Sequence, residues 1–220
     1  QVEFAGYFDQ TARQLKNIID SEGLSAPSCH QPLEALQQNL DGVIEQALVM
    51  GHQYLVLPYL YEAQRQTLDQ YKALAVFLNQ AGERIKAAGM QLAYHNHEFE
   101  FIQLSGAMPY DVLLNETDSN LVQMELDLYW VVKAGLSPLE WFARQPGRFP
   151  LWHVKDMDNT DKKNFTEVGN GVIDFGTIFS QAKTSGMKHF FVEQDVCPGS
   201  PFDSIKQSIG YIKSNLIKHL

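Results

Sequence analysis

The sequence predicts an α/β protein of the (β/α)8-barrel class, and three observations lead to that prediction. Short apolar strands alternate with amphipathic helices seven times along the chain, which favours a parallel sheet covered by helices. The turn after the first strand, Gly6-Tyr7-Phe8-Asp9, lacks the glycine-rich phosphate loop typical of a doubly wound sheet. Ionisable residues recur at the strand ends, where barrels of this class carry their functional groups.

The length of the chain indicates how much of the barrel is present. Barrels of this class run to about 250 residues, whereas this chain has 220 residues. We therefore expect a single domain over residues 1–220 that lacks its first strand-helix unit at the N-terminus. An element of a partner subunit could replace that unit, so a homo-oligomer is one possibility. A well-folded monomer in size-exclusion chromatography would count against this replacement.

The first half of the chain is expected to form four strands and three helices. The expected strands cover residues 2–5, 24–30, 54–58 and 90–97, and the expected helices cover residues 11–21, 33–50 and 67–88. Apolar residues recur at helical spacing in these helices, as Leu40, Val43 and Ala47 do in the second one. Gly51 and Gly89 follow the second and third helices and end them.

The second half repeats the pattern. The expected strands cover residues 121–129, 150–156 and 189–195, and the expected helices cover residues 111–116, 138–145, 175–184 and 200–220. In the first half, the run at residues 54–58 is almost entirely apolar, which is typical of a buried parallel strand. Gly186 ends the helix before the last strand.

Composition limits the partners and the location. The net charge of -9 argues against a nucleic-acid partner and against an anionic membrane surface. No apolar run approaches the roughly 20 residues that span a bilayer. No signal-peptide pattern is visible, so we expect a cytoplasmic protein, although the start at Gln1 leaves a processed or exported form open. Cys29 and Cys197 are expected to be free thiols.

The strand at residues 90–97 carries the first functional pattern. Side chains alternate faces along a strand, so His95 and His97 point one way while Tyr94 and Asn96 point the other. Two imidazoles on one face at a strand end indicate a site. The alternative is a half-exposed strand end with two hydrogen-bonded histidines.

The same alternation brings ionisable groups to one end of six strands. They are Glu3, His30, His95 with His97, Glu125 with Asp127, His153 with Lys155, and Glu193 with Asp195. Buried carboxylates and imidazoles must be paired or bound to metal, since desolvating a charge costs several kcal/mol. The set therefore predicts a divalent metal ion, with Mn, Co, Zn, Fe and Mg all open. The alternatives are that Glu3 is an exposed terminus, that Asp127 caps a helix, and that Lys155 and Asp156 form a solvated pair.

Five motifs resemble the xylose-isomerase-like barrel superfamily of sugar phosphate isomerases and epimerases, which includes inosose dehydratases. They are Tyr94-His95-Asn96-His97, Glu125-Leu126-Asp127, His153-Val154-Lys155-Asp156, residues 168–175, and Val192-Glu193-Gln194-Asp195. The resemblance covers nearly the whole chain and is more specific for the superfamily than for one reaction. It implies a metal set of Asp127, His153 and Glu193, with His95 where many members have a glutamate and Glu98 as the rival ligand. The Tyr-His-Asn-His form is more similar to the inosose-dehydratase branch than to the ketose epimerases.

The resemblance implies an isomerase or epimerase that acts on a small sugar or sugar-derived ketone through an enediolate. Glu193 would be a ligand and the base, with His97 or Glu98 as the opposing acid or base. Lys155 would bind a substrate oxygen, and His30, His97 and Glu3 would complete the substrate site. The alternatives are a metal-dependent dehydratase and a non-catalytic ligand-binding barrel.

Overall fold

The computed structural model describes residues 1–219, and its chain divides into two compact units. The first unit runs from Gln1 to Met124, and the second begins at Glu125. The boundary lies inside strand β5 (Val122–Asp127). Each unit is a run of parallel strands with helices between them, as the alternation of the sequence predicted.

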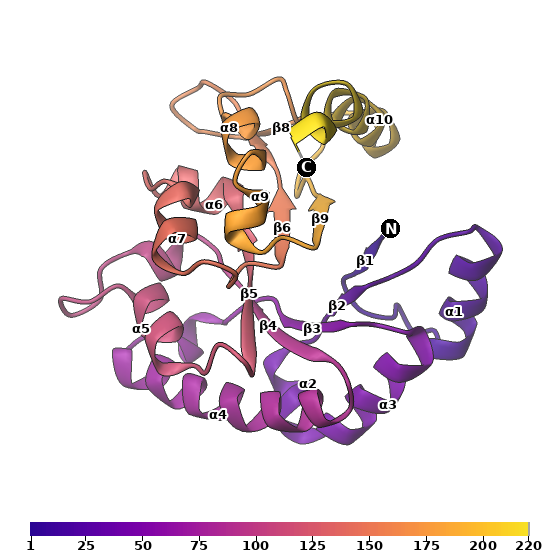
Figure 1. The fold of residues 1–220 in the computed structure, drawn as a ribbon, viewed down its shortest axis with the longest axis vertical. Helices are drawn as coiled ribbons and strands as arrows, with labels where there is room; N and C mark the ends of the chain where they lie inside the picture. Colours follow the sequence, from indigo (N-terminus) through magenta and orange to yellow (C-terminus); the bar gives the residue numbers. More distant parts are fainter. Residues whose placement is uncertain (220) are drawn as a thin grey trace. The chain divides into compact units, whose positions relative to one another are not determined.

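The first unit holds four parallel strands in the order β1-β2-β3-β4. The strands are β1 (Glu3–Phe4), β2 (Ser28–His30), β3 (Tyr54–Leu57) and β4 (Gln91–His95). The helices are α1 (Ala12–Ser21), α2 (Leu33–Gln38), α3 (Leu40–Met50), α4 (Leu68–Ala87) and α5 (Pro109–Glu116), with 3-10 turns η1 (Glu62–Gln64) and η2 (Phe99–Phe101). Figure 1 shows α2, α3 and α4 on the same side of β3 and β4. This arrangement buries Leu55, Val56 and Leu57 completely.

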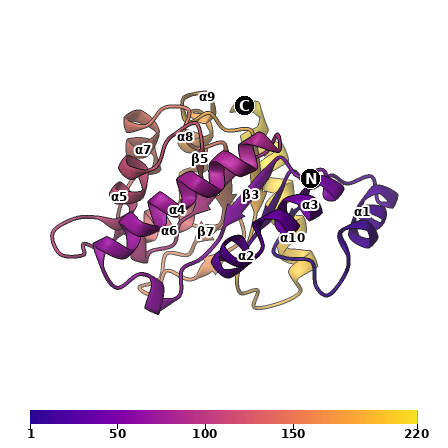
Figure 2. The same cartoon turned by 90° about the horizontal axis from the view of Figure 1, so that it is seen from below.

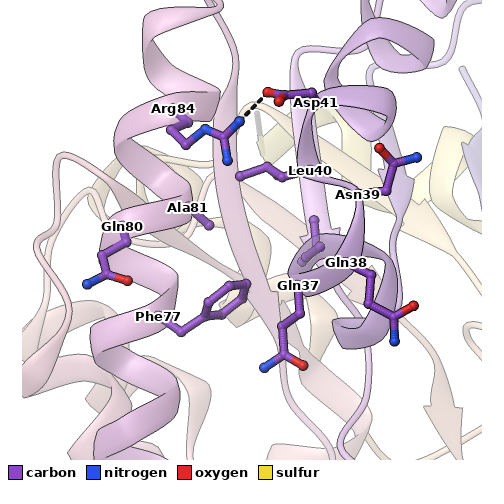
Figure 3. Close-up of a pocket in the computed structure, with 10 residues that line it drawn as sticks. Gln37, Gln38, Asn39, Leu40, Asp41, Phe77, Gln80, Ala81 and Arg84 are labelled. Carbon is purple, nitrogen blue, oxygen red and sulfur yellow. Dashed lines mark hydrogen bonds and ion pairs between the residues drawn. The ribbon is translucent and has the colours of Figure 1, made fainter.

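The expected helix over residues 33–50 is two helices, because Asn39 interrupts it. Asn39 has a non-helical backbone, and its side chain accepts a hydrogen bond from the Gly42 N–H at 3.2 Å, which caps α3. The break faces α4 across a pocket, where Arg84 of α4 pairs with Asp41 of α3 (Figure 3). The apolar stripe runs on through both helices, so the prediction was wrong only in expecting one continuous helix.

The second unit holds three parallel strands and a small antiparallel pair. The parallel strands follow the order β5, β6 (Leu151–Val154) and β9 (His189–Val192), and the pair is β7 (Asp156–Met157) with β8 (Phe165–Thr166). The helices are α6 (Leu128–Lys133), α7 (Pro138–Arg144), α8 (Phe175–Phe179), α9 (Ala182–Ser185) and α10 (Pro201–Tyr211), followed by the turns η3 (Ile212–Leu216) and η4 (Ile217–His219). Helices α7 and α9 lie side by side in two views (Figure 1, Figure 2). Phe142 and Trp152 stack in the core at 5.1 Å between ring centroids.

Several expected boundaries in the second unit are wrong. The expected strands over residues 121–129, 150–156 and 189–195 end at Asp127, Val154 and Val192. Helix α6 starts directly after Asp127. The expected helix over residues 175–184 is split into α8 and α9. The closing helix ends as α10 plus two short turns, and residue 220 lies outside the described residues.

Two expectations from composition agree with the structure. Within residues 1–219, no helix combines the length and apolar character needed to cross a membrane. Cys29 is buried and Cys197 is half-buried, and both are free thiols.

Candidate metal centre

Three predicted metal ligands meet at the ends of neighbouring strands in the second unit. Asp127 is the last residue of β5, His153 lies in β6, and Glu193 follows β9 directly. The register pairs Asp127 with His153, and His153 with Phe191, so Glu193 lies two residues beyond the partner of His153 on the next strand. Their ligand atoms all lie within 4.8 Å of one another, a spacing close to that of ligands around one small divalent ion.

The His153 ring lies between two carboxylates. Its Nδ1 is 2.5 Å from Oε2 of Glu193, and its Nε2 is 3.3 Å from Oε2 of Glu125. His153 is 2% exposed and Glu125 is fully buried. The alternation of the sequence placed Glu125 on the inward face but gave it no role. In the structure it is the group that orients the far side of the imidazole.

Lys155 forms the centre of an ion-pair cluster. Its ammonium group lies 3.0 Å from Oδ2 of Asp127, 2.6 Å from Oε2 of Glu193 and 2.9 Å from Oδ1 of Asp195. Burial acts against the charged form, but the charge of Asp127, then those of Glu193 and Asp195, outweigh it and hold the pKa of Lys155 above its usual value. Lys155 is therefore a buried cation at neutral pH.

Asp127 performs two structural tasks with its two oxygens. Its side chain accepts the N–H of Trp130 through Oδ1 at 3.2 Å, which caps α6, while Oδ2 faces Lys155. Capping and membership of the cluster are thus compatible, although the sequence presented them as alternatives. Burial raises the pKa of Asp127 despite the opposing pull of Lys155 and then His153.

The charge balance of the cluster fits a divalent cation. Among the described residues of the second unit, the carboxylates of Glu125, Asp127, Glu193 and Asp195 form ion pairs with His153 or Lys155. Buried carboxylates cost several kcal/mol unless they are paired or bound to metal. Imidazole and carboxylate are also the donor types that such metals take. The residues of the second unit therefore suit a divalent metal ion by charge and by chemistry.

Glu193 is ionised in this setting. Burial acts to raise its pKa, but the hydrogen bond and charge of His153, and then those of Lys155, outweigh burial and hold the pKa well below its usual range. Its side chain is still 39% exposed, unlike those of Asp127 and His153. A bound molecule can therefore reach Glu193, and also Asp195, whose side chain is 33% exposed.

Asp156 explains the glycine-rich motif at residues 168–175. Its carboxylate accepts N–H groups from Gly169 at 2.9 Å, Gly171 at 3.0 Å and Ile173 at 3.2 Å. A Cβ on Gly171 would lie 2.3 Å from Oδ1 of Asp156, so only glycine fits there. Lys155 and Asp156 are 2% and 1% exposed, so their interpretation as a solvated pair is wrong. Asp156 fastens the loop beside the cluster.

The first unit gathers the other predicted site residues. His30 Nε2 lies 3.0 Å from Oε2 of Glu3, and the His30 and His95 rings are 5.5 Å apart. The His95 and His97 rings are 5.0 Å apart, although β4 ends at His95 and His97 lies in the loop beyond. The Glu3 side chain is only 7% exposed, so its interpretation as an exposed terminus is wrong. The addition of His95 to the ligands of the second unit stays a prediction.

Two aromatic residues, Tyr59 and Phe99, pack against the ring of His97. Its ring stacks on Phe99 at 5.6 Å and meets the edge of Tyr59 at 5.0 Å. Glu98, the rival ligand, lies half-buried at the start of η2. The part of His97 and Glu98 in a substrate site stays a prediction.

Sequence comparison decides the family of the chain. The pattern of the xylose isomerase-like TIM barrel family matches residues 2–215. The chain belongs to this family. The TIM barrel predicted from the alternation of strands and helices is thereby confirmed.

Curated members of the family include inosose dehydratases. The inosose dehydratase of Lacticaseibacillus casei is 30% identical over 169 residues, which cover 68% of this chain and 56% of that protein. The inosose dehydratase of Clostridium perfringens is 29% identical over 164 residues, which cover 66% of this chain and 54% of that protein. The chain thus matches little more than half the length of these relatives.

Solved structures of the family share the fold. A sugar phosphate isomerase/epimerase from Parabacteroides distasonis has a TM-score of 0.82 and 26% identity, covering 96% of this chain and 82% of that one. The zinc-bound IOLI protein has a TM-score of 0.75 at 16% identity, covering 96% of this chain and 84% of that one. The second likeness is one of fold alone.

The structure adds a buried acid behind the His97 loop that the sequence analysis passed over. Glu100 is fully buried, and it accepts the O–H of Tyr94 at 2.5 Å and the N–H of His97 at 2.8 Å. Burial raises its pKa to about 7, against the lowering effect of these hydrogen bonds. The sequence carried a signal for the burial of Glu100, because this acid lies between Phe99 and Phe101. An apolar residue on each side of an acid indicates that the acid is buried.

The protein is expected to lose stability through Glu100 as pH rises from 4.5 to about 7. The pKa in the folded state is raised from 4.5 to about 7, so the folded state binds more protons in this window and the free energy of unfolding falls with rising pH. The total is about 3 kcal/mol, at 1.36 kcal/mol per pKa unit. In Glu100→Gln the amide oxygen can accept the His97 N–H and the amide NH2 can donate to the Tyr94 oxygen, so the variant has a similar shape but no titrating carboxyl group. It should remove this component in urea unfolding at several pH values. Glu83→Gln, on the exposed face of α4, should leave it in place; an identical pH profile for wild type and Glu100→Gln would contradict the prediction.

Proposed function

We propose that the chain forms the catalytic part of a divalent-metal-dependent enzyme that removes a proton from the carbon next to a carbonyl of a keto sugar or keto polyol. The observation that carries the proposal is the cluster of Asp127, His153 and Glu193 with a charged Lys155 among them. Metal ligands, an ionised carboxylate and a fixed ammonium group are the parts that such a proton transfer needs. Relatives that carry the names inosose dehydratase and sugar phosphate isomerase/epimerase support the substrate class.

The metal would be held by Asp127, His153 and Glu193, with His95 of the first unit as the fourth ligand. When bound, a divalent ion such as Mn, Co, Zn, Fe or Mg supplies Lewis-acid polarisation of the substrate carbonyl. The second-unit ligands suit this ion by their excess negative charge, and Glu125 holds the His153 ring from its far side.

The protein's own groups would divide the proton transfer. Glu193 is ionised at neutral pH and partly exposed, so one carboxylate oxygen can accept the proton from carbon. Lys155 would give up one of its three carboxylate contacts to donate to a substrate oxygen, where it offsets the negative charge that develops. His97 or Glu98 would be the second acid or base, and His30 and Glu3 would bind substrate hydroxyl groups.

Two outcomes follow from the same first step. In isomerisation or epimerisation a proton returns to a carbon atom, so the product has the mass of the substrate. In dehydration the hydroxyl group on the next carbon leaves with a proton, so the product has lost one water. We propose the isomerase or epimerase outcome first, and the names of the curated relatives make dehydration the second candidate.

Deuterium exchange tests the shared first step. The purified protein with Mn is incubated in D2O with inosose and with a panel of ketoses, and the recovered sugars are weighed by mass spectrometry. Uptake of deuterium at an unchanged carbon skeleton is the expected result, and loss of one water selects the dehydratase. A protein that neither exchanges a proton nor changes any of these compounds, with metal bound, would be a ligand-binding barrel, and the proposal would fall.

A further inference from the structure

The second unit has a basic cavity beside the candidate metal centre. The cavity measures about 500 Å³ and lies between α6, the loop from β7 to β8, and the segment after β9. Its lining includes Lys133, Lys162 and Lys163, and a single acidic residue, Asp158. Such a group of lysines is unexpected on a chain of net charge -9. Its local charge points to an anionic ligand.

The acid in the lining is committed to the loop itself. The carboxylate of Asp158 accepts the hydroxyl of Thr160 at 2.7 Å and N–H groups of Thr160 and Asn164 at 3.1 and 3.0 Å. These hydrogen bonds, first those of the Thr160 and Asn164 side chains, lower the pKa of Asp158. The carboxylate therefore shapes the loop that carries Lys162 and Lys163, and the three ammonium groups exceed it in charge.

Two of the lysines are held in position. Lys163 has a φ of 50°, the left-handed region that a side chain rarely adopts. The hydroxyl of Tyr129 donates to the Lys163 carbonyl at 2.6 Å, and the Lys163 ammonium donates to the Lys133 carbonyl at 3.3 Å. The Lys133 ammonium in turn lies 3.3 Å from the Tyr129 hydroxyl. Local strain of this kind is kept where the surrounding structure imposes it.

The rings of Tyr129, Trp130 and Phe165, which we call the aromatic floor, connect this cavity with the metal centre. The Trp130 ring centre is 4.8 Å from the Lys133 ammonium and 6.0 Å from the Lys155 ammonium, so both ammonium groups lie near one indole. The Phe165 ring is 5.9 Å from the Lys155 ammonium and 4.4 Å from the Tyr129 ring. A sugar ring rests its C–H face on such rings. A sugar held at Lys155 would therefore direct one substituent toward Lys133 and Lys163.

We propose that this cavity, the lysine subsite formed by Lys133, Lys162 and Lys163, binds an anionic substituent of the sugar substrate. The substituent is a phosphate or a carboxylate, because both accept charge-assisted hydrogen bonds from ammonium groups. The assignment of the ligand as a sugar rests on the proposed function. The subsite itself rests on the cavity, its charge and the aromatic floor.

Calorimetric binding with three sugars tests the subsite without any turnover. D-Glucose, D-glucuronate and D-glucose 6-phosphate are titrated into the wild-type protein, into Lys133→Gln/Lys163→Gln, and into Lys206→Gln, which changes an exposed lysine of α10. We expect at least one anionic sugar to bind about tenfold more tightly than glucose, as charge-assisted contacts imply. The double variant should lose this preference and Lys206→Gln should keep it. Added salt should weaken the anionic sugars and leave glucose unaffected.

The pattern across the three sugars separates the outcomes. Preference for glucose 6-phosphate identifies a sugar phosphate substrate, and preference for glucuronate identifies a sugar acid. Equal affinity for all three sugars, binding of none of them, or a preference that survives in a folded double variant overturns the proposal. Binding of the anionic sugars together with a negative deuterium-exchange assay would overturn the proposed function and leave the subsite standing.

Discussion

The His153→Ala variant is expected to lose most of the divalent metal that we expect the wild-type protein to bind. His153 is the one nitrogen donor among the three proposed ligands of the second unit, and its ring is fixed from both sides by Glu193 and Glu125. Alanine removes that donor and leaves the fully buried Glu125 without its imidazole partner. Elemental analysis should show metal falling from about one equivalent per chain to a small fraction of that. The free energy of unfolding without metal should fall by about 3 kcal/mol, as expected when one partner of a buried ionic pair is removed.

The control is His189→Ala, which removes a half-buried histidine of β9 in the same unit. It should retain the metal content of the wild type. Retention of a full equivalent of metal by His153→Ala would rule out the proposed ligand set. The absence of metal from every variant, even after soaking with Mn, would contradict the proposal that the enzyme depends on a divalent metal ion.

The Glu193→Gln variant is expected to keep its metal and to lose nearly all activity. Glutamine has the size of glutamate and one oxygen that can still act as a ligand, but it cannot accept a proton from carbon. Loss of a positioned general base lowers kcat by about 10²- to 10⁴-fold. The assay is the deuterium exchange of the most active substrate from the keto-sugar panel, with metal content measured on the same sample.

Glu140→Gln is the matched control, since Glu140 is an exposed glutamate of α7 in the same unit. It should exchange deuterium at the wild-type rate. Full activity of Glu193→Gln would remove the base role and transfer it to His97 or Glu98. Loss of metal together with activity would instead assign Glu193 to binding the ion, and the base role would then need a separate test at His97.

The regular elements were predictable because their signals are local. The periodic apolar positions of α4 and the apolar run of β3 follow from which side chains each element must bury. The residues that show this pattern lie within one short segment of the sequence. The interruption at Asn39 was not predictable from periodicity, since the stripe continues through it. What breaks the helix is a side chain that competes for the backbone N–H of Gly42.

The residues of the candidate site were predictable, but the contacts among them were less so. Alternation along strands identified Asp127, His153, Lys155 and Glu193 as neighbours on one face, and the structure brings them together. It could not tell whether Asp127 caps a helix or joins the cluster, because that choice depends on where α6 begins. In the structure Asp127 does both.

By itself the sequence determined the barrel class, the strand ends that carry ionisable groups, and the family motifs, because each depends on spacing along one short segment. Only the tertiary structure decided that Glu125 holds the His153 ring, that Asp156 fastens the loop at Gly169 and Gly171, and that lysines from separate segments share one cavity. These features depend on distances between residues far apart in the chain. Such distances are set by the packing of whole elements, which no local pattern encodes.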